Sequence, residues 1–235
     1  MFIVDGLVVM SFGSQEFWDK WYRNRVSGED QQNLKDEVEW YVNWRDLYLG
    51  LIRQVPTIFD KKTNLTILVV GCGNSSFAEE MLSFETNDNQ SFSKQKIFSI
   101  DYSEPVIQFM KQKFPSNANQ YIVCDVCNMS KQFPNDDLFD LIIDKGTLDS
   151  ILCNEKSGEM VSSMMSEIKR VSKRNGKLIV VSDGEVHERN HYFRTLVRNV
   201  NDDILHFKID STQNEKTRGF AQDEKYNCYV ITINK

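Results

Sequence analysis

Four short apolar runs, each followed by a glycine turn or an aspartate, constrain the fold of this chain more than any other feature. The runs are Leu65–Val70, Lys96–Ile100, Tyr121–Cys124 and Leu138–Ile143, and the residues that follow them are Gly71, Asp101, Asp125 and Asp144. Their length and apolar character are typical of buried strands. Helical segments lie between several of the runs, which predicts an α/β fold with a mostly parallel sheet and helices on both faces.

The rest of the chain completes this architecture. We expect helices at Ser75–Leu82, Pro105–Phe114, Gly158–Val171 and Val186–Val200, and further strands at Lys177–Val181, Ile204–Ile209 and Tyr226–Ile233. The last two strands have no helix between them, so they are predicted to form an antiparallel hairpin at one edge of the sheet. The polar stretches Phe84–Lys94 and Ser211–Lys225 are predicted loops. The order of the strands does not follow from the sequence.

The N-terminal part is predicted to be a helical cap, residues 1–60, on a core of residues 61–235 within one domain. Ser14 can cap a helix that runs to about Arg25. A second helix is expected from Glu37 to Val55, because apolar residues recur there at helical spacings and Pro56 follows.

Composition narrows the classes of partner. With 40% hydrophobic and 26% charged residues among 235, the chain has globular values. A net charge of −6 disfavours direct binding of nucleic acid. No apolar stretch approaches the roughly 20 residues of a membrane span, and the start lacks the features of a signal peptide. We therefore expect a soluble protein in the cytoplasm, without a membrane partner. The sequence does not indicate an oligomeric state.

The cysteines do not predict a disulfide scaffold or a metal site. There are five of them, an odd number, and they are widely scattered. Cys124 and Cys127 form a lone C-x-x-C pair without a second Cys or His pair nearby. We interpret them as buried structural thiols and expect no bound metal.

The residues at the strand ends are the candidate ligand-binding residues, because open α/β sheets bind ligands at the carboxyl ends of their strands. They are Gly71, Cys72, Gly73, Asn74, Ser75, Asp101, Tyr102, Ser103, Asp125, Val126, Asp144, Lys145 and Gly146. Each aspartate taken alone would also be explained as a cap of the next helix. Together they favour a site for a nucleotide-type cofactor.

The turn after the first strand distinguishes between such cofactors. Gly71 and Gly73 allow close approach of the backbone, and the following helix N-terminus suits an anionic group such as the carboxylate of S-adenosylmethionine. Asp101 can accept hydrogen bonds from ribose hydroxyls. Asp125 can accept one from the adenine amino group, and Tyr102 and Val126 can flank the adenine ring. A dinucleotide motif would have a third glycine at Ser76, and no Walker lysine follows, so S-adenosylmethionine fits better than NAD or a nucleoside triphosphate.

Several phrases of the sequence together resemble one known family. They are FGSQEFWDKWY (12–22), VEWYVNW (38–44), LVVGCGNS (68–75), DYS (101–103), CDV (124–126) and FDLIIDKGTLDSIL (139–152). They are similar to the group of class I methyltransferases that includes the elongation factor 1-alpha lysine methyltransferases and the citrate synthase lysine methyltransferase. The resemblance implies a Rossmann-like, seven-stranded sheet with an N-terminal helical cap. It also implies S-adenosylmethionine as the cofactor, S-adenosylhomocysteine as the product, and a protein substrate methylated on lysine, with elongation factor 1-alpha as a candidate.

The resemblance also assigns roles outside the strand ends. Trp18 and Tyr22 would reach the cofactor from the cap, and Lys145 would contribute its stem or backbone rather than its charge. Val38 stands where the family has an aromatic residue. The segment after the fifth strand, 182–189, lacks the aromatic residue and the proline of the family pattern, and this leaves the substrate open.

Two aspartates, Asp144 and Asp149, are candidates for orienting the target amine. A helix cap or a salt bridge is an equal explanation for Asp149. The aromatic residues of the cap, Trp18, Trp21, Trp40 and Trp44, would either form a cation–π cage for the amine or pack as core.

Two other functions fit the same residues. The first is a methyltransferase that acts on a small molecule. The second is a cofactor-binding protein without catalysis, or a relative of the polyamine synthases, although no acidic pair suited to a polyamine is evident.

Overall fold

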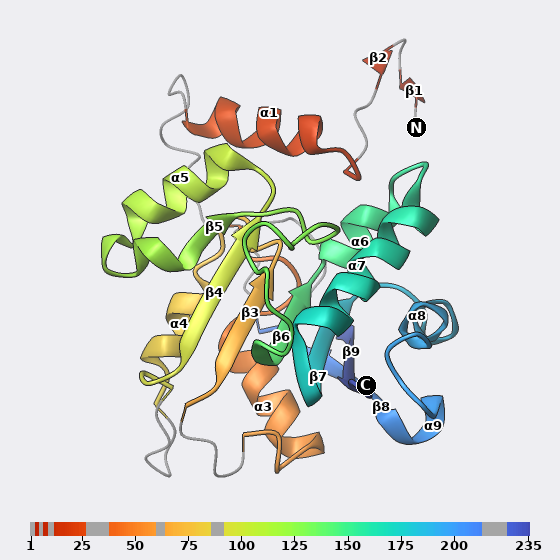
Figure 1. Ribbon diagram of the computed structural model, residues 1–235. Helices are drawn as coiled ribbons and strands as arrows, with labels where there is room; N and C mark the ends of the chain where they lie inside the picture. Colours follow the sequence, from red (N-terminus) through yellow and green to blue (C-terminus); the bar gives the residue numbers. More distant parts are fainter. Residues whose placement is uncertain are drawn as a thin grey trace.

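The computed structural model describes residues 3–4, 7–8, 12–26, 38–59, 64–85, 92–212 and 225–235. Its main feature is a seven-stranded sheet with the order β5-β4-β3-β6-β7-β9-β8 (Figure 1). The strands are β3 (Thr66–Val70), β4 (Lys96–Asp101), β5 (Tyr121–Val123), β6 (Phe139–Lys145), β7 (Ser172–Ser182), β8 (Ile204–Asp210) and β9 (Lys225–Thr232). The first five are parallel, and β9 pairs antiparallel with both β7 and β8. The expected sheet with its antiparallel edge hairpin is confirmed.

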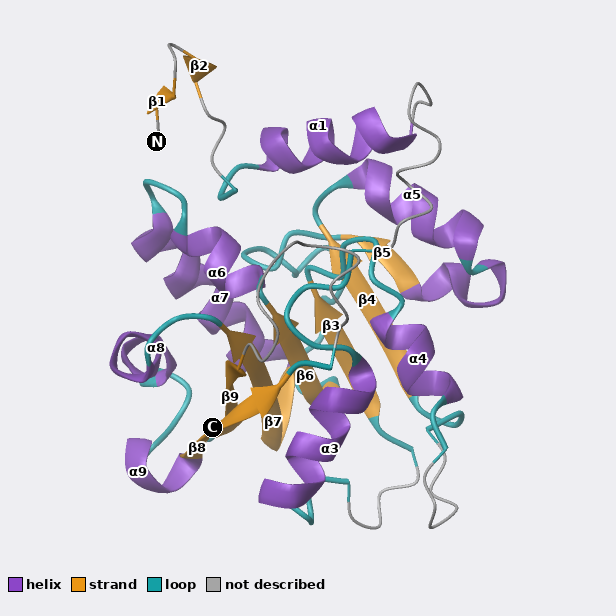
Figure 2. Ribbon diagram, turned by 180° about the vertical axis from the view of Figure 1, so that it is seen from behind, coloured by secondary structure: helices purple, strands orange, loops and turns teal. Residues whose placement is uncertain are grey.

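Helices cover both faces of this sheet. The helices of the described residues are α1 (Gln15–Val26), α3 (Trp44–Gln54), α4 (Phe77–Ser83), α5 (Glu104–Lys113), α6 (Thr147–Leu152), α7 (Ser157–Val171), α8 (Val186–Phe193) and α9 (Val200–Asp203), with the 3-10 helix η1 (Pro115–Gln120). Side chains of β3 alternate between the faces, so Ile67 and Val69 pack with α3, α4 and α5, while Leu68 and Val70 pack with α6, α7 and α8. Figure 2 shows the face that carries α3.

The N-terminal helix lies across the end of the sheet to which the parallel strands point (Figure 1). The Ser14 hydroxyl accepts a hydrogen bond from the N–H of Phe17 at 3.2 Å, as expected of a helix cap. Before α1, β1 (Ile3–Val4) and β2 (Leu7–Val8) form a separate antiparallel pair. The α1 helix is therefore positioned to cover a ligand at the strand ends.

The prediction that the second helix begins at Glu37 is wrong. Glu37 lies outside the described residues, and residues 38–43 are not helical. The α3 helix begins after Asn43, whose side chain accepts a hydrogen bond from the N–H of Asp46 at 2.9 Å. Tyr41 has a φ of +66°, which an α-helix excludes. Residues 38–43, the part of the predicted cap that precedes α3 and passes along the strand ends, are called the strap below.

A second correction concerns the helix predicted at Val186–Val200. The α8 helix ends at Phe193, and α9 is a separate short helix. The carboxylate of Asp203 accepts from the N–H groups of Arg198 and Asn199 at 3.0 and 2.9 Å, which stabilises a turn in place of a continuous helix.

Other boundaries differ more modestly. Helices α6 and η1 do not appear among the sequence predictions, and β7 begins at Ser172 instead of Lys177, with a register shift where it pairs with β6. Residues 86–91 and 213–224, which belong to the two predicted loops, lie outside the described residues, as does the predicted boundary between cap and core at residue 60. No helix in the described part of the chain has the length and apolar character to cross a membrane.

Candidate functional site

A cavity lies at the carboxyl ends of the parallel strands and is bordered by α1 and the strap. The predicted site residues that line it are Trp18, Tyr22, Gly71, Cys72, Gly73, Ser75, Asp101, Tyr102, Asp125, Val126, Lys145, Gly146 and Asp149. Asn74, Ser103 and Asp144 are buried beside it but are not part of its lining. The fold therefore brings most of the predicted site residues together in one cavity.

The glycines at this edge allow three segments to meet. Gly71, Gly73 and Gly146 have φ values of +57°, +53° and +86°, which favour glycine. An added Cβ would lie 2.0 Å from Thr147 Oγ1 at Gly71, and 2.8 Å from the Tyr22 hydroxyl at Gly73. The glycine turn thus passes directly beneath α1 and beside α6, where a ligand can contact its backbone.

Asp101 is a buried carboxylate that can accept further hydrogen bonds. Its Oδ2 accepts from the N–H of Gly73 at 3.0 Å, and its Oδ1 accepts from the N–H of Ser103 at 2.9 Å. Burial raises the pKa of Asp101 to about 6, the charge of Asp19 adds to this rise, and the backbone donors oppose it. Two N–H donors leave further lone-pair positions on the two oxygens, so a ligand with a pair of hydroxyls fits here.

The end of the cavity over β5 is lined by an exposed carboxylate and two thiols. Asp125 Oδ1 accepts from the N–H of Cys127 at 2.8 Å, and Val126 is buried next to it. Cys124, Cys127 and Met160 also line the cavity, although the sequence analysis did not assign them to the site. Burial raises the pKa of both of these thiols to about 12, so they remain protonated. All five cysteines are free, and within the described residues no group of side chains is arranged to hold a metal ion.

The α1 helix contributes two aromatic rings to the cavity wall. Trp18 and Tyr22 stack with their ring centroids 5.9 Å apart. The indole N–H of Trp18 donates to the carbonyl oxygen of Phe12 at 2.6 Å and to Ser150 Oγ at 3.2 Å. Trp44, by contrast, is fully buried among phenylalanines on one face of the sheet. It belongs to the core and not to a cage around a ligand.

The strap is fastened to the strand ends by a buried ion pair. The ammonium of Lys145 pairs with Glu39 and also donates to the carbonyl oxygen of Trp40 at 2.9 Å. The Ser75 hydroxyl donates to the other oxygen of Glu39 at 2.6 Å. The charge of Lys145 is thus directed to Glu39, and its stem remains at the cavity wall.

Asp144 lies beneath the cavity at the start of α6. It is fully buried, and its carboxylate accepts from the N–H of Thr147 at 2.8 Å and from the N–H of Leu148 at 3.1 Å. Burial, together with the nearby charge of Asp149, raises the pKa of Asp144 to about 7. These contacts satisfy the first N–H groups of α6, whose N-cap position is Gly146.

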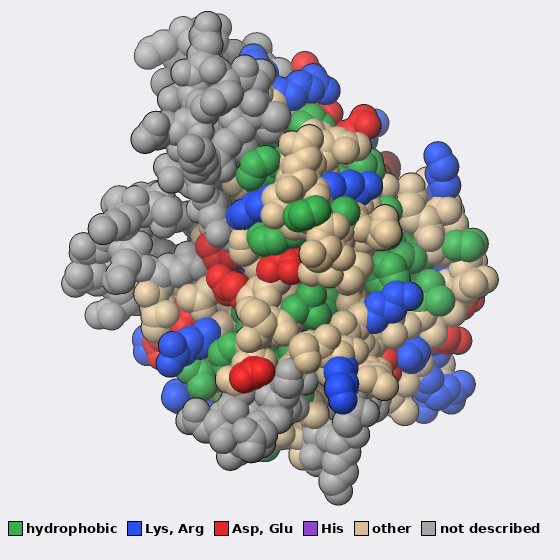
Figure 3. All heavy atoms as spheres, turned by 90° about the vertical axis from the view of Figure 1, so that its left-hand side faces the viewer, with side chains coloured by type: hydrophobic (Ala, Val, Ile, Leu, Met, Phe, Trp, Pro, Cys, Tyr) green, Lys and Arg blue, Asp and Glu red, His purple; other side chains and the backbone are tan. Residues whose placement is uncertain are grey.

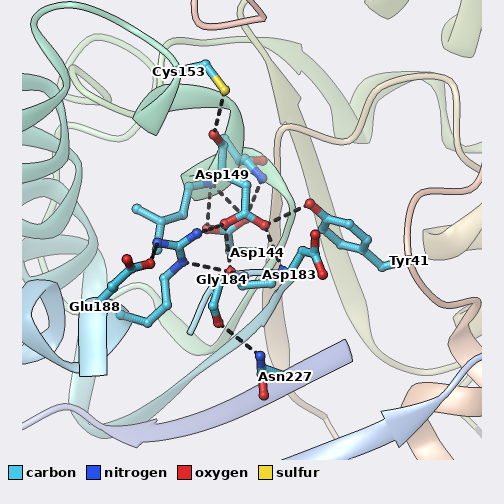
Figure 4. Close-up of polar contacts among 12 residues, drawn as sticks. Tyr41, Asp144, Asp149, Cys153, Asp183, Gly184, Glu188 and Asn227 are labelled. Atoms are coloured by element: carbon cyan, nitrogen blue, oxygen red, sulfur yellow. Dashed lines mark hydrogen bonds and ion pairs between the residues drawn. The ribbon is translucent and has the colours of Figure 1, made fainter. Parts of the chain in front are cut away.

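Asp149 lies at the cavity wall, in the middle of a polar network (Figure 4). Its Oδ1 accepts from Ser182 Oγ at 2.6 Å and from the guanidinium of Arg189 at 2.8 Å. Its Oδ2 accepts from the Tyr41 hydroxyl at 2.8 Å and from the N–H of Asp183 at 3.2 Å. Tyr41 is a further cavity residue that the sequence analysis missed, because its neighbours continue the helical spacing of α3.

Comparison with known proteins adds a family and a fold. The methyltransferase domain family model matches residues 61–224. The eEF1A lysine and N-terminal methyltransferase of Bos taurus is 31% identical over 178 residues, which are 75% of this chain and 22% of that protein. EEF1A lysine methyltransferase 4 of Bos taurus is 25% identical over 190 residues, which are 76% of this chain and 64% of that protein. The chain thus spans about a fifth of the length of the first of these relatives.

Solved structures with the same fold have little sequence in common with the chain. The N-methyltransferase NodS of Bradyrhizobium japonicum, in complex with S-adenosyl-L-homocysteine, has a TM-score of 0.57 at 14% identity and covers 93% of this chain and 99% of its own. A TehB-like S-adenosylmethionine-dependent methyltransferase of Corynebacterium glutamicum has a TM-score of 0.53 at 14% identity. The match covers 94% of this chain and 98% of that chain. At these identities the likeness concerns the fold alone.

Proposed function

The chain belongs to the methyltransferase domain family, and we propose that it transfers a methyl group from S-adenosylmethionine to lysine side chains of a protein substrate. Family membership confirms the methyltransferase class expected from the sequence. S-adenosylmethionine as the cofactor is part of the proposal, supported by the glycine turn and the carboxylates that line the cavity. The lysine substrate is the other part, proposed on the names of relatives that match three quarters of the chain.

The observation that carries the proposal is the order of groups along the sheet edge. From β5 to β6 the strand ends present Asp125, Asp101, the glycine turn and then Gly146 with α6. We assign Asp125 to the adenine amino group, Asp101 to the ribose hydroxyls, and the turn at Gly71 to the methionine part. Trp18 and Tyr22 would cover the cofactor from α1. The reacting end is then directed toward β6 and β7.

Bound S-adenosylmethionine supplies a methyl group that is already activated by the positive sulfur. The protein has to hold the amine in line with the methyl group and exclude water from it. A lysine amine has an ordinary pKa of about 10.4, so it must lose its proton before it can react. A wall of Trp18, Trp40 and Tyr41 rings lowers the polarity around the amine and favours its neutral form.

The charge of the protein fits a cationic target. Asp183, Glu185 and Glu188 are exposed in the segment that follows β7, on the side of the reacting end. The net charge is −6. On the face shown in Figure 3, acidic and basic side chains are mixed. The carboxylates of Asp183, Glu185 and Glu188 would attract a basic segment of a protein. We propose elongation factor 1-alpha as the substrate and the cytoplasm as the location.

One labelling experiment tests the proposal. Cell extract is incubated with purified protein and radiolabelled S-adenosylmethionine, and the labelled products are separated. We expect label in protein, recovered as methyllysine after hydrolysis, with elongation factor 1-alpha among the labelled bands. Label only in small molecules would support a small-molecule methyltransferase, and an absence of label would support a binding protein without catalysis.

Cofactor binding is tested separately by calorimetry. Asp101→Ala removes the acceptor of two hydroxyl groups, so we expect the dissociation constant for S-adenosylmethionine to rise about a hundredfold. Asp202→Ala, on the distant α9, is the control and should bind as the wild type does. Equal affinity of Asp101→Ala and wild type would contradict the assignment of Asp101.

A further inference from the structure

Tyr41 has a backbone conformation that its surroundings must hold in place. Its φ is +66°, in the left-handed region that residues with a Cβ seldom adopt. The N–H of Val42 donates to the carbonyl oxygen of Trp40 at 2.9 Å, which is the hydrogen bond of a γ-turn centred on Tyr41. The Tyr41 ring contacts that of Tyr226 at a centroid distance of 4.7 Å, and its Cε2 would lie 3.0 Å from a Cβ at Gly146. Strain that is held in this way is concentrated at functional positions.

The hydroxyl of Tyr41 is a neutral group at the cavity wall. It donates to Asp149 Oδ2, and Figure 4 shows the Tyr41 side chain pointing toward that carboxylate. Burial, followed by the charge of Asp149, raises the pKa of Tyr41 far above its usual range. The phenol therefore keeps its proton. Since that proton is directed to Asp149, the oxygen can accept a hydrogen bond from another donor but cannot act as a base.

Asp149 has little capacity left to hold a substrate itself. A carboxylate offers about four acceptor positions, and the four donors from Tyr41, Ser182, Asp183 and Arg189 fill them. Its charge is compensated by Arg189 in a pair whose side chains are only 11% and 15% exposed. An amine could contact Asp149 only by displacing one of these partners.

The segment after β7 holds Asp149 in this position. Arg189 is buried and donates from Nε to Ser182 Oγ at 2.8 Å as well as to Asp149. Gly184 makes room for it, because an added Cβ would lie 1.9 Å from the guanidinium. The carbonyl oxygen of Gly184 accepts from the side-chain amide of Asn227 at 2.9 Å, which fixes the segment to β9 (Figure 4). The divergent stretch 182–189 thus has a structural task at the reacting end.

From these contacts we infer that Tyr41 orients the target amine by accepting a hydrogen bond from its N–H, and that Asp149, held by Arg189, positions Tyr41. The inference rests on the proposed function. In the reaction, the lone pair of the neutral amine forms the N–C bond, and the electron pair of the breaking S–C bond stays on sulfur. The proton released from nitrogen goes to water, and Tyr41 neither gains nor loses one.

This arrangement discriminates between amines by their hydrogens. A primary or secondary amine still has an N–H to donate to Tyr41 while its lone pair faces the methyl group. A dimethylated lysine in its neutral form has no N–H, so the hydroxyl oxygen of Tyr41 would be left without a donor. Tyr41 therefore favours the first two transfers over the third.

Tyr41→Phe tests the inference, because it removes only the hydroxyl. Cell extract is labelled as above, and mono-, di- and trimethyllysine are separated after hydrolysis. We expect the rate of lysine labelling to fall about tenfold and the share of trimethyllysine to rise, while the dissociation constant for S-adenosylmethionine changes less than about twofold. Tyr192→Phe, which removes a hydroxyl from α8 away from the cavity, should leave all three quantities unchanged.

An unchanged rate and product distribution in Tyr41→Phe, beside a wild type that labels lysine, overturns this inference alone. A wild type that labels no lysine overturns the proposed function and the inference with it. The role of Asp149 is separated by a double-mutant cycle with Asp149→Asn. If Asp149 acts through Tyr41, the double variant labels lysine about as slowly as the slower single variant. Reductions that multiply would mean that Asp149 holds the amine independently.

Discussion

At the scale of single residues, two buried aspartates with similar surroundings have different tasks. Asp101 accepts two backbone hydrogen bonds and lines the cavity, whereas Asp144 lies beneath the cavity and accepts from the first turn of α6. Burial raises the pKa of both carboxyls, to about 6 and about 7. Since Asp144 has its acceptors directed to the helix, we assign it to holding α6 and not to the chemistry.

This assignment predicts a pH-dependent effect of Asp144→Asn. A folded pKa of about 7, above the ordinary 3.8, means that ionising Asp144 costs stability. The contribution of its protonated form is complete below about pH 4 and is lost as the pH rises through 7. Asparagine never ionises, and its side-chain oxygen can still accept from the same N–H groups, so we expect a higher melting temperature than wild type at pH 8 and a much smaller gain at pH 5.

Thermal unfolding at the two pH values measures this difference, with Asp202→Asn on α9 as the control. Equal destabilisation by Asp144→Asn at both pH values would contradict the raised pKa. Labelling activity adds a second readout, because a residue that only holds α6 can lose its charge with activity retained, whereas an amine-orienting carboxylate cannot.

At the scale of elements, the strands and the strap differ in how far the sequence predicts them. The buried strands follow from local apolar runs, and the residues after them reach the cavity because parallel strands end at one edge. The strap does not follow from local pattern. Its apolar residues Trp40 and Tyr41 continue the spacing of α3, but contacts distant in sequence, above all that of Glu39 with Lys145, hold the strap in another conformation.

The hydrogen-bond network around Asp149 could not be predicted from the sequence, for the same reason. Asp149 could be selected as a candidate, yet its partners come from the strap, from β7 and from α8. Their positions depend on the strand order, in which β6 lies between β3 and β7. Arg189 matches the arginine of the family pattern in the stretch 182–189, but the resemblance assigned it no role.

The helix cap at the junction between the strap and α3 is expected to stabilise the folded protein. Asn43 caps α3 through its side chain, which Asn43→Ala would remove. Loss of such a cap costs about 1 kcal/mol, which lowers the melting temperature of a chain of this size by about 2–4 °C. Asn43→Ser keeps a capping oxygen and should unfold close to the wild-type temperature. A melting temperature that is the same in all three proteins would mean that Asn43 is not the cap of α3.

At the scale of the whole molecule, the cavity is assembled from parts of the chain that are far apart in sequence. The α1 helix contributes Trp18 and Tyr22, the strap contributes Tyr41, and the strand ends contribute the glycine turn and the carboxylates. The ion pair of Glu39 and Lys145 joins the strap to the end of β6, more than a hundred residues away. Loss of this ion pair should therefore both lower the stability of the folded protein and change the shape of the cavity.

The last prediction concerns that pair. The side chains of Lys145 and Glu39 are 7% and 12% exposed, so Lys145→Met leaves a buried carboxylate without its cation. Such a loss costs about 3 kcal/mol, or about 6–12 °C in melting temperature for a chain of this length. Removing the charge of the partner as well, in the double variant Glu39→Gln with Lys145→Met, should recover much of this loss, because no uncompensated charge remains. A double variant that melts lower than Lys145→Met would show that the pair is not the main contact of either side chain. Added S-adenosylmethionine should raise the melting temperature of all these variants by mass action, but least where the strap has come away from β6 and the cavity is incomplete.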